Sequence, residues 1–134
     1  MADSYLPLLK GIGAALKADT TLAALVSSRV YSDTPVNPTF PFVTVSIASS
    51  DFSAKDFTGM DHTVTCRVYS RLNSPNQCAA IRAAIYNKLN RTPSGVTLDS
   101  GTLSILDYNG VSNIALDADG VTWDGLIQFR AVVT

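Results

Sequence analysis

The residues of this chain that could do chemistry are one histidine, two cysteines and a short run of aspartates. The run Asp117-Ala118-Asp119-Gly120 places carboxylates at alternate positions before a glycine, as at the start of a calcium-binding EF-hand loop. Such a loop also needs a third acidic position and a distal glutamate, and this chain contains no glutamate. We therefore expect a β-turn with solvated aspartates here, and no bound metal.

The single histidine, His62, lacks the partners that catalysis or metal binding would need. Imidazole metal sites usually combine two or three histidines, and a nucleophilic triad needs a nucleophile and an acid around one histidine. Asp61 is adjacent, but consecutive strand residues point to opposite faces of a sheet. Neither Cys66 nor Cys78 falls in a CxxC motif, and no GxSxG motif is present. We expect no enzyme activity and no cofactor.

The elements that position these residues are clearest in segment 59–89. Val64, Cys66 and Val68 alternate with polar residues, which predicts a strand with one buried face. Apolar residues at spacings of three, four and four then predict a helix: Cys78, Ile81, Ile85 and Leu89. Because both cysteines fall on apolar faces, we expect reduced core thiols, not a disulfide, in a protein made in a cytosol.

The start of that helix is predicted by Ser74-Pro75-Asn76-Gln77. Ser74 could accept a hydrogen bond from the backbone N–H of Gln77, and the Gln77 side chain could reach back to the N–H of Ser74. Pro75 would occupy the first helical position, where its missing N–H has no cost. The sequence therefore predicts a capping box.

The rest of the chain predicts two more helices and several strands. An apolar stripe marks an amphipathic first helix, formed by Tyr5, Leu9, Ile12 and Leu16. Asp19 and its neighbouring threonines are candidate caps for a short second helix. A strand over 42–48 should begin directly after Pro41, because proline cannot donate to a strand ladder. The second half predicts short strands near Val96–Leu98 and Leu103–Ile105, turns at Asn109-Gly110 and Asp119-Gly120, and a last strand over 122–133.

Residues 49–62 form a polar connection between the strands over 42–48 and 62–70, with Phe52, Phe57 and Met60 interspersed. We interpret this connection as a long β-hairpin arm. Aromatic residues exposed in such a loop would indicate a partner; the alternative is that they fold back onto the core.

The predicted order of elements indicates an α+β fold in a single domain, residues 1–134. We expect a mainly antiparallel sheet of four to five strands, with two main helices packed on one face and a long β-hairpin arm. The other face of the sheet would stay partly open.

Composition restricts the possible partners. Charged residues make up 16% of the chain, well below the ~25% that is typical of soluble domains. This low fraction fits either a surface that partners cover or a domain rich in serine and threonine. The net charge is −1 and the ten basic residues are scattered, so we expect no direct nucleic-acid readout. No apolar run approaches the ~20 residues that cross a membrane, and the first residues lack the basic region of a secretory signal.

The ordered set of elements resembles the small tail terminator, or tail completion, proteins of long-tailed phages and gene transfer agents. The segments that carry the resemblance cover nearly the whole chain: Leu22-Ala23-Ala24-Leu25-Val26, Arg29-Val30-Tyr31, Pro41-Phe42-Val43-Thr44-Val45, His62–Ser70 with the helix after it, and Trp123–Ala131. One departure is the extended 107–121 region.

The resemblance implies a hexameric ring of this protein on the finished tail tube. Such a ring would stop further addition of tube subunits and present a surface to the head-side connector or stopper protein. Its partners would be further copies of itself, the major tail tube protein and that connector. It would be assembled in the bacterial cytoplasm and lie at the head-proximal end of the tail of a phage or phage-like particle.

Seven residues are candidate interface contacts within this interpretation: Phe52, Lys55, Phe57, Met60, Arg67, Arg71 and Arg130. The aromatic residues are proposed as anchors, because aromatic side chains dominate binding hot spots. The arginines could instead be solvated charges of a sheet face. Two other functions remain open: a head-completion or connector protein, and a monomeric cytosolic module that binds a ligand on its open sheet face.

Overall fold

A computed structural model describes residues 3–55, 59–72 and 74–134. Its elements, in chain order, are α1 (Tyr5–Ala18), α2 (Thr20–Val26), β1 (Val30–Tyr31), β2 (Phe42–Asp51), β3 (Met60–Ser70), α3 (Asn76–Leu89), the 3-10 turn η1 (Pro93–Gly95), β4 (Leu103–Leu116) and β5 (Trp123–Val133). The strand after Pro41 begins at Phe42, as predicted. The strands on either side of the arm are longer at the arm end than predicted, because they continue to pair as far as Asp51 and Met60.

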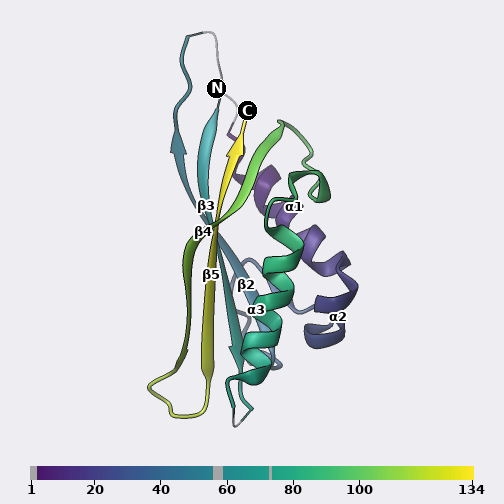
Figure 1. Cartoon of the computed structure of the whole chain (residues 1–134), viewed down its shortest axis with the longest axis vertical. Coiled ribbons are helices and arrows are strands. Elements are labelled where there is room, and N and C mark those ends of the chain that lie inside the picture. The colour runs from purple at the N-terminus through teal and green to yellow at the C-terminus, as the bar shows by residue number, and fades with distance from the viewer. Residues whose placement is uncertain (1–2, 56–58, 73) are drawn as a thin grey trace.

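The five strands form one sheet in the order β1-β2-β3-β5-β4. The pairs β2–β3, β3–β5 and β5–β4 are antiparallel, and only the two-residue strand β1 pairs in parallel, with Val43 and Thr44 of β2. All three helices lie on one side of this sheet (Figure 1). The predicted α+β class, with two main helices on one face, is confirmed.

The core lies between the helices and the covered face of the sheet. Phe129, Val64 and Cys66 are fully buried there, opposite Leu16 of α1 and Ile85 of α3. Gly125 of β5 allows α3 to approach closely, since an added Cβ would lie 2.5 Å from the Sγ of Cys78. Cys66 and Cys78 are both free and buried, as predicted. Burial raises the pKa of Cys66 to about 12 and that of Cys78 to about 11.

The first two helices begin and pack for local reasons. Asp19 caps α2 by accepting a hydrogen bond from the N–H of Leu22 at 3.0 Å, as predicted. In α1 the buried residues include Leu8 and Gly11 as well as the predicted Ile12 and Leu16, whereas Tyr5 is exposed. Gly11 is required by the approach of the chain after α3, because an added Cβ would lie 2.7 Å from the carbonyl oxygen of Thr97.

The predicted capping box at the start of α3 is wrong. The Gln77 side chain instead accepts a hydrogen bond from Ser70 Oγ at 2.6 Å. Ser74 Oγ accepts from the N–H of Asn76, at 3.1 Å, and not from that of Gln77. The Gln77 side chain, which the local pattern assigned to the helix cap, therefore bonds instead to the hydroxyl of Ser70 at the end of β3.

The region before β5 also differs from prediction. Val96–Leu98 is not a strand; it follows the 3-10 turn η1 and packs beneath α1. Asn109-Gly110 is not a hairpin turn, because β4 continues through it with a shift in pairing between Tyr108 and Ser112. Gly110 has a φ of +90°, so the left-handed conformation that glycine permits serves a β-bulge here. The turn at Asp119-Gly120 is confirmed, and it joins β4 to β5.

Candidate assembly surfaces

The face of the sheet that no helix covers is polar at its centre. Its central rows alternate with the core residues and carry hydroxyl, amide and guanidinium groups: Thr44, Ser46, Thr63, Thr65, Arg67, Gln128 and Arg130. A shallow hollow of about 370 Å³ lies on this face, between Ser50, Asp61, Asn109 and Arg130. The open face therefore offers hydrogen-bonding groups at its centre, and at one end it carries an aromatic cluster in which Phe42 packs on Phe40 and stacks on Tyr69.

Two of the predicted arginines on this face are paired with aspartates. Arg130 makes a bidentate contact with Asp61, with Nη2 at 2.9 Å and Nε at 3.1 Å from Oδ2. This contact raises the pKa of Arg130. Arg67 is 3.4 Å from Oδ2 of Asp124 in a looser pair. The charges of the open face are thus largely compensated within one chain.

Asp124 is the least satisfied group of the open face. Its Oδ1 atom is buried and has no hydrogen-bond partner among the described residues. Burial raises the pKa of Asp124, the nearby Asp117 raises it further, and Arg67 acts in the opposite direction. Arg67 contacts only Oδ2, so the buried Oδ1 atom is left without a donor among the described residues.

Arg71, the third predicted arginine, holds the lower end of the sheet together. Its guanidinium carbon lies 4.1 Å from the ring centroid of Phe40, and its Nε donates to Thr122 Oγ1 at 3.1 Å. Phe40 in turn packs on Phe42, with ring centroids 5.1 Å apart. Asp119 accepts from the Thr122 hydroxyl, and hydrogen bonds to residues 121 and 122 lower its pKa to about 2. Arg71 is thus engaged inside the chain.

The predicted arm is a hairpin that reaches beyond the helices at the top of the molecule (Figure 1). The Phe52 N–H donates to the carbonyl of Gly59 at 3.1 Å, so pairing continues past the ends of β2 and β3. Phe52 is 43% exposed and Lys55 is exposed, whereas Phe57 lies outside the described residues. Met60 is only 7% exposed, so it is a buried residue at the base of the arm and not an exposed side chain of the loop.

His62 joins the base of the arm to the start of α1. Its Nε2 lies 2.8 Å from Ser4 Oγ and its Nδ1 lies 2.7 Å from Ser49 Oγ. A neutral imidazole has one donor and one acceptor nitrogen, and two hydroxyls satisfy both. Burial lowers the pKa of His62, although Asp3 and Asp61 oppose this shift. The arrangement is a neutral structural link.

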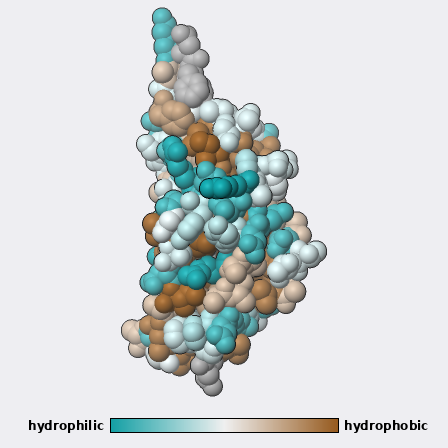
Figure 2. Space-filling model, in the orientation of Figure 1, coloured by the Kyte–Doolittle hydropathy of each residue, from teal (hydrophilic) through white to brown (hydrophobic). Residues whose placement is uncertain are grey.

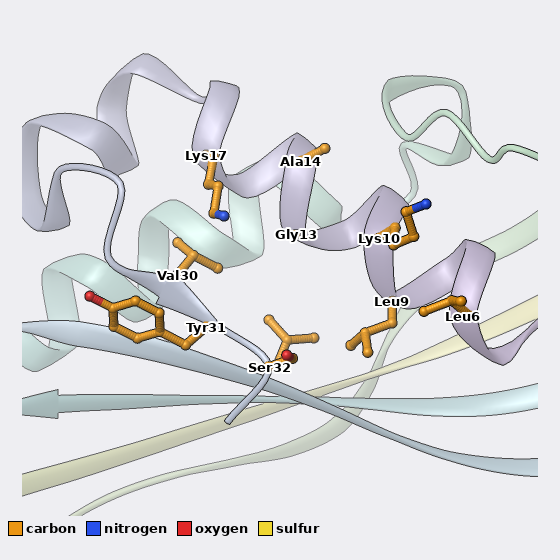
Figure 3. A pocket seen from close by; sticks show the side chains of 10 residues that line it. Leu6, Leu9, Lys10, Gly13, Ala14, Lys17, Val30, Tyr31 and Ser32 are labelled. Atoms are coloured by element: carbon orange, nitrogen blue, oxygen red, sulfur yellow. The ribbon is translucent and has the colours of Figure 1, made fainter. Parts of the chain in front are cut away.

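The outer edge of β2 is open over more than half of its length. Strand β1 pairs only with Val43 and Thr44, and no other described strand pairs with this edge from Val45 to Asp51. A groove of about 410 Å³ lies at this edge on the helix side, between α1, β1 with the residue after it, and Val45 of β2. Its apolar lining includes Leu6, which is 58% exposed, and Leu9. Lys17 points toward Val30 at one end of the groove, and Lys10 extends away from it (Figure 3).

The outer edge of β4 is open over its second half only. Near its start, the carbonyl of Leu106 accepts from the N–H of Arg91, and the N–H of Tyr108 donates to Asn90 Oδ1. The five residues Ser112–Leu116 have no such cover among the described residues. A groove of about 230 Å³ lies on the helix side of this part, between α3 and β4.

The two edges and their grooves were not predicted from the sequence. Leu6 gave one signal, since it is apolar but lies outside the stripe predicted for the first helix. Leu116 and Val121 gave another, as apolar residues beside a turn; they are 48% and 54% exposed. The side of the molecule in Figure 2 carries several separate hydrophobic patches among polar residues, without one large apolar area.

The part of the chain that the structure describes has neither a metal-binding cluster nor a membrane-spanning helix. No three metal-ligating side chains come together there. None of the described helices has the length and apolarity that crossing a membrane requires.

Comparison with known proteins places the chain in a class. Residues 10–134 match the protein family described as Tail completion protein gp17. A chain from a solved structure of the virion of a native gene transfer agent particle has the same fold, with a TM-score of 0.84 and 25% sequence identity. That similarity covers 94% of this chain and 93% of the other. Among curated proteins, no sequence matches this one.

The chain belongs to the tail completion protein gp17 family, as the resemblance in its sequence predicted. Its role is therefore structural, in the assembly of phage-type tails.

Proposed function

We propose that this protein forms a ring, expected to be hexameric, on the end of the finished tail tube. The ring stops the addition of tube subunits and provides the tail side of the joint with the head. The observation that carries this proposal is the similarity to a chain of a gene transfer agent virion over 94% of the length, together with family membership over residues 10–134. Its partners are further copies of itself, the major tail tube protein and a head-side connector protein.

The open face of the sheet supports a ring through which nucleic acid can pass without binding to it, because this face lacks a cluster of unpaired cations among the described residues. Phosphate binding needs clustered, unpaired cations. The two arginines on the face, Arg67 and Arg130, are each paired with an aspartate, and serines and threonines fill much of the rest. A surface of this kind offers little net charge to a polyanion. The role we propose is accordingly structural and not catalytic.

The arm supports contact with the tube or with a neighbouring copy. Its described residues reach past the helices, so they can touch a partner without moving the core (Figure 1). Phe52 and Lys55 are the exposed members of the predicted set that lie on it. We propose these two as tube or neighbour contacts, with Phe57 as a third that the sequence alone supports.

Deletion of the gene tests the proposal by electron microscopy of the particles that remain. If the protein terminates the tube, its absence gives tails that are too long and lack heads. Headless tails of normal length would instead indicate a head-completion or connector role. Normal particles would contradict both, and would leave a binding module unrelated to assembly.

A further inference from the structure

We propose that the open half of β4 in one copy pairs with the open half of β2 in the next copy, so that the sheet continues from subunit to subunit around the ring. This inference rests on the proposed ring function and identifies the surfaces that close it. The occupant of each open edge is thus a second copy of this chain.

Strand directions fit this joint. Antiparallel pairing links β2 to β3, β3 to β5 and β5 to β4, so β2 and β4 run in opposite directions at opposite edges of the sheet. If β4 lies beside β2 of the next copy, with the same face inward, the new pair is antiparallel as well. Two different surfaces on opposite sides of one subunit form the head-to-tail contact that closes a ring.

The open part of β2 is long enough to pair with the whole open part of β4. Pairing with β1 covers the start of β2, and Asn90 and Arg91 cover the start of β4. The edge of β2 is unpaired from Val45 to Asp51, and in the proposed joint its last five residues, Ile47–Asp51, lie opposite the five open residues Ser112–Leu116 of β4. Unpaired edges of this kind readily add a strand from another chain.

Side-chain directions select the register. Leu116 pairs with Trp123 of β5 and lies on the helix side of the sheet, as does Ile47 of β2. With Leu116 opposite Ile47, its half-exposed side chain enters the apolar groove between α1 and β2 of the next copy, beside Leu6 and Leu9. In the copy that contributes β4, the smaller groove between α3 and β4 then faces the α1 helix of the next copy.

Charge also fits. In this register the β4–β5 turn, with Asp117 and Asp119, extends past Leu116 toward the end of the groove where Lys17 points inward (Figure 3). No acidic group lies within ion-pair distance of Lys17 among the described residues, whereas Lys10 is paired with Asp99 at 3.2 Å. An acidic turn therefore meets an unpaired lysine at the mouth of an apolar groove.

Disulfide cross-linking in assembled tails tests the joint. Ser50 and Asn113 are exposed, lie on the open face, and come opposite each other in the proposed register. Within one chain they are separated by three strand spacings of about 4.8 Å each, well beyond the ~7 Å between Cα atoms that a disulfide can bridge. Any bond between them therefore joins two copies. Burial keeps the native thiols of Cys66 and Cys78 out of the reaction.

Tails that contain Ser50→Cys/Asn113→Cys should give a ladder of covalent oligomers after mild oxidation, up to a hexamer, and each single variant should give none. A second pair, Ser50→Cys/Ala115→Cys, covers a register shifted by two residues. If the protein is present in tails but neither pair cross-links, the edge joint is wrong and the proposed function stands. If the unmodified protein is absent from purified tails, the proposed function itself fails.

Leu116→Asp gives an independent test, with Val36→Asp as the matched control. Both residues are exposed, 48% and 91%, so neither change should unfold the chain, but only Leu116 lies at the proposed joint. We expect Leu116→Asp to lower the amount of protein on tails at least tenfold, and Val36→Asp to leave it unchanged. Equal incorporation of the two variants would overturn the joint.

Discussion

The two faces of the sheet are formed by alternating residues of the same strands, but they differ in chemistry: one face packs against the helices and the other is exposed. The helix side is apolar, burial raises the pKa of its thiols, and burial lowers the pKa of its histidine, which is bonded to two hydroxyls. The open side is built from hydroxyls and compensated ion pairs, and one carboxylate oxygen of Asp124 lacks a partner among the described residues. Most of the folding free energy should therefore come from the helix side, whereas the open side adds an aromatic cluster around Phe42 at one end and is polar at its centre.

Neighbouring residues of β5 give the largest expected difference between the faces. Phe129 is fully buried on the helix side, and Gln128 lies on the open side. Phe129→Ala should lower the free energy of unfolding by about 3–5 kcal/mol, because it leaves a cavity in the core. Gln128→Ala should change it by no more than about 0.5 kcal/mol. Urea denaturation measures both, and similar losses would contradict the division between the faces.

Two glycines test the close packing of the helix side. Gly125→Ala should destabilise the protein by about 1–3 kcal/mol, because the new Cβ overlaps the Sγ of Cys78 and the core must shift. Gly13→Ala is the control: nothing lies within 4 Å of its added Cβ, and alanine favours a helix over glycine by about 0.5–1 kcal/mol. Thermal unfolding should thus move in opposite directions for the two variants.

The pH dependence of stability tests the neutral histidine. The pKa of His62 is lowered in the folded protein, so below the usual value of 6.5 the unfolded chain binds a proton that the folded chain excludes. Stability should therefore fall as the pH is lowered from 6.5 to about 5, where aspartates still titrate little. In His62→Gln this slope should be much reduced. An unchanged slope would assign the effect to other groups.

The smallest effect is expected for the ion pair of the open face. Arg130→Ala should lower stability only slightly, because Arg130 and Asp61 are both partly exposed to solvent. The difference from the unmodified protein should shrink further at high salt. A loss as large as that of Gly125→Ala, or one that does not depend on salt, would show that the open face contributes to folding after all.

Local patterns predicted much of the fold. The alternation in β3 and the stripe in α3 depend on residues close in sequence, and so does the Asp19 cap. The predictions failed where a distant partner decided the outcome. The Gln77 side chain accepts a hydrogen bond from Ser70 of β3 instead of capping its own helix. Asn109-Gly110 became a bulge because β5 pairs with β4 on both sides of it.

The candidate surfaces were predicted only in part, for the same reason. Arm residues such as Phe52 and Lys55 could be found because a polar loop interrupted two clear strands. The aspartate partners of Arg67 and Arg130 depend on which strands are neighbours. The open edges depend on the whole strand order, and on the short β1 strand that covers only the start of β2.

The link through His62 has a mechanical consequence. Ser49 and His62 belong to the two strands at the base of the arm, and Ser4 precedes the helix that roofs the β2 groove. The Ser4 N–H also contacts the sulfur of Met60 at 3.5 Å. If the arm contacts the tube as proposed, these bonds would couple the base of the arm directly to the start of α1. Contact of the arm with the tube and contact of the α1 groove with the next subunit, both proposed above, would then be mechanically coupled through the two hydrogen bonds of His62.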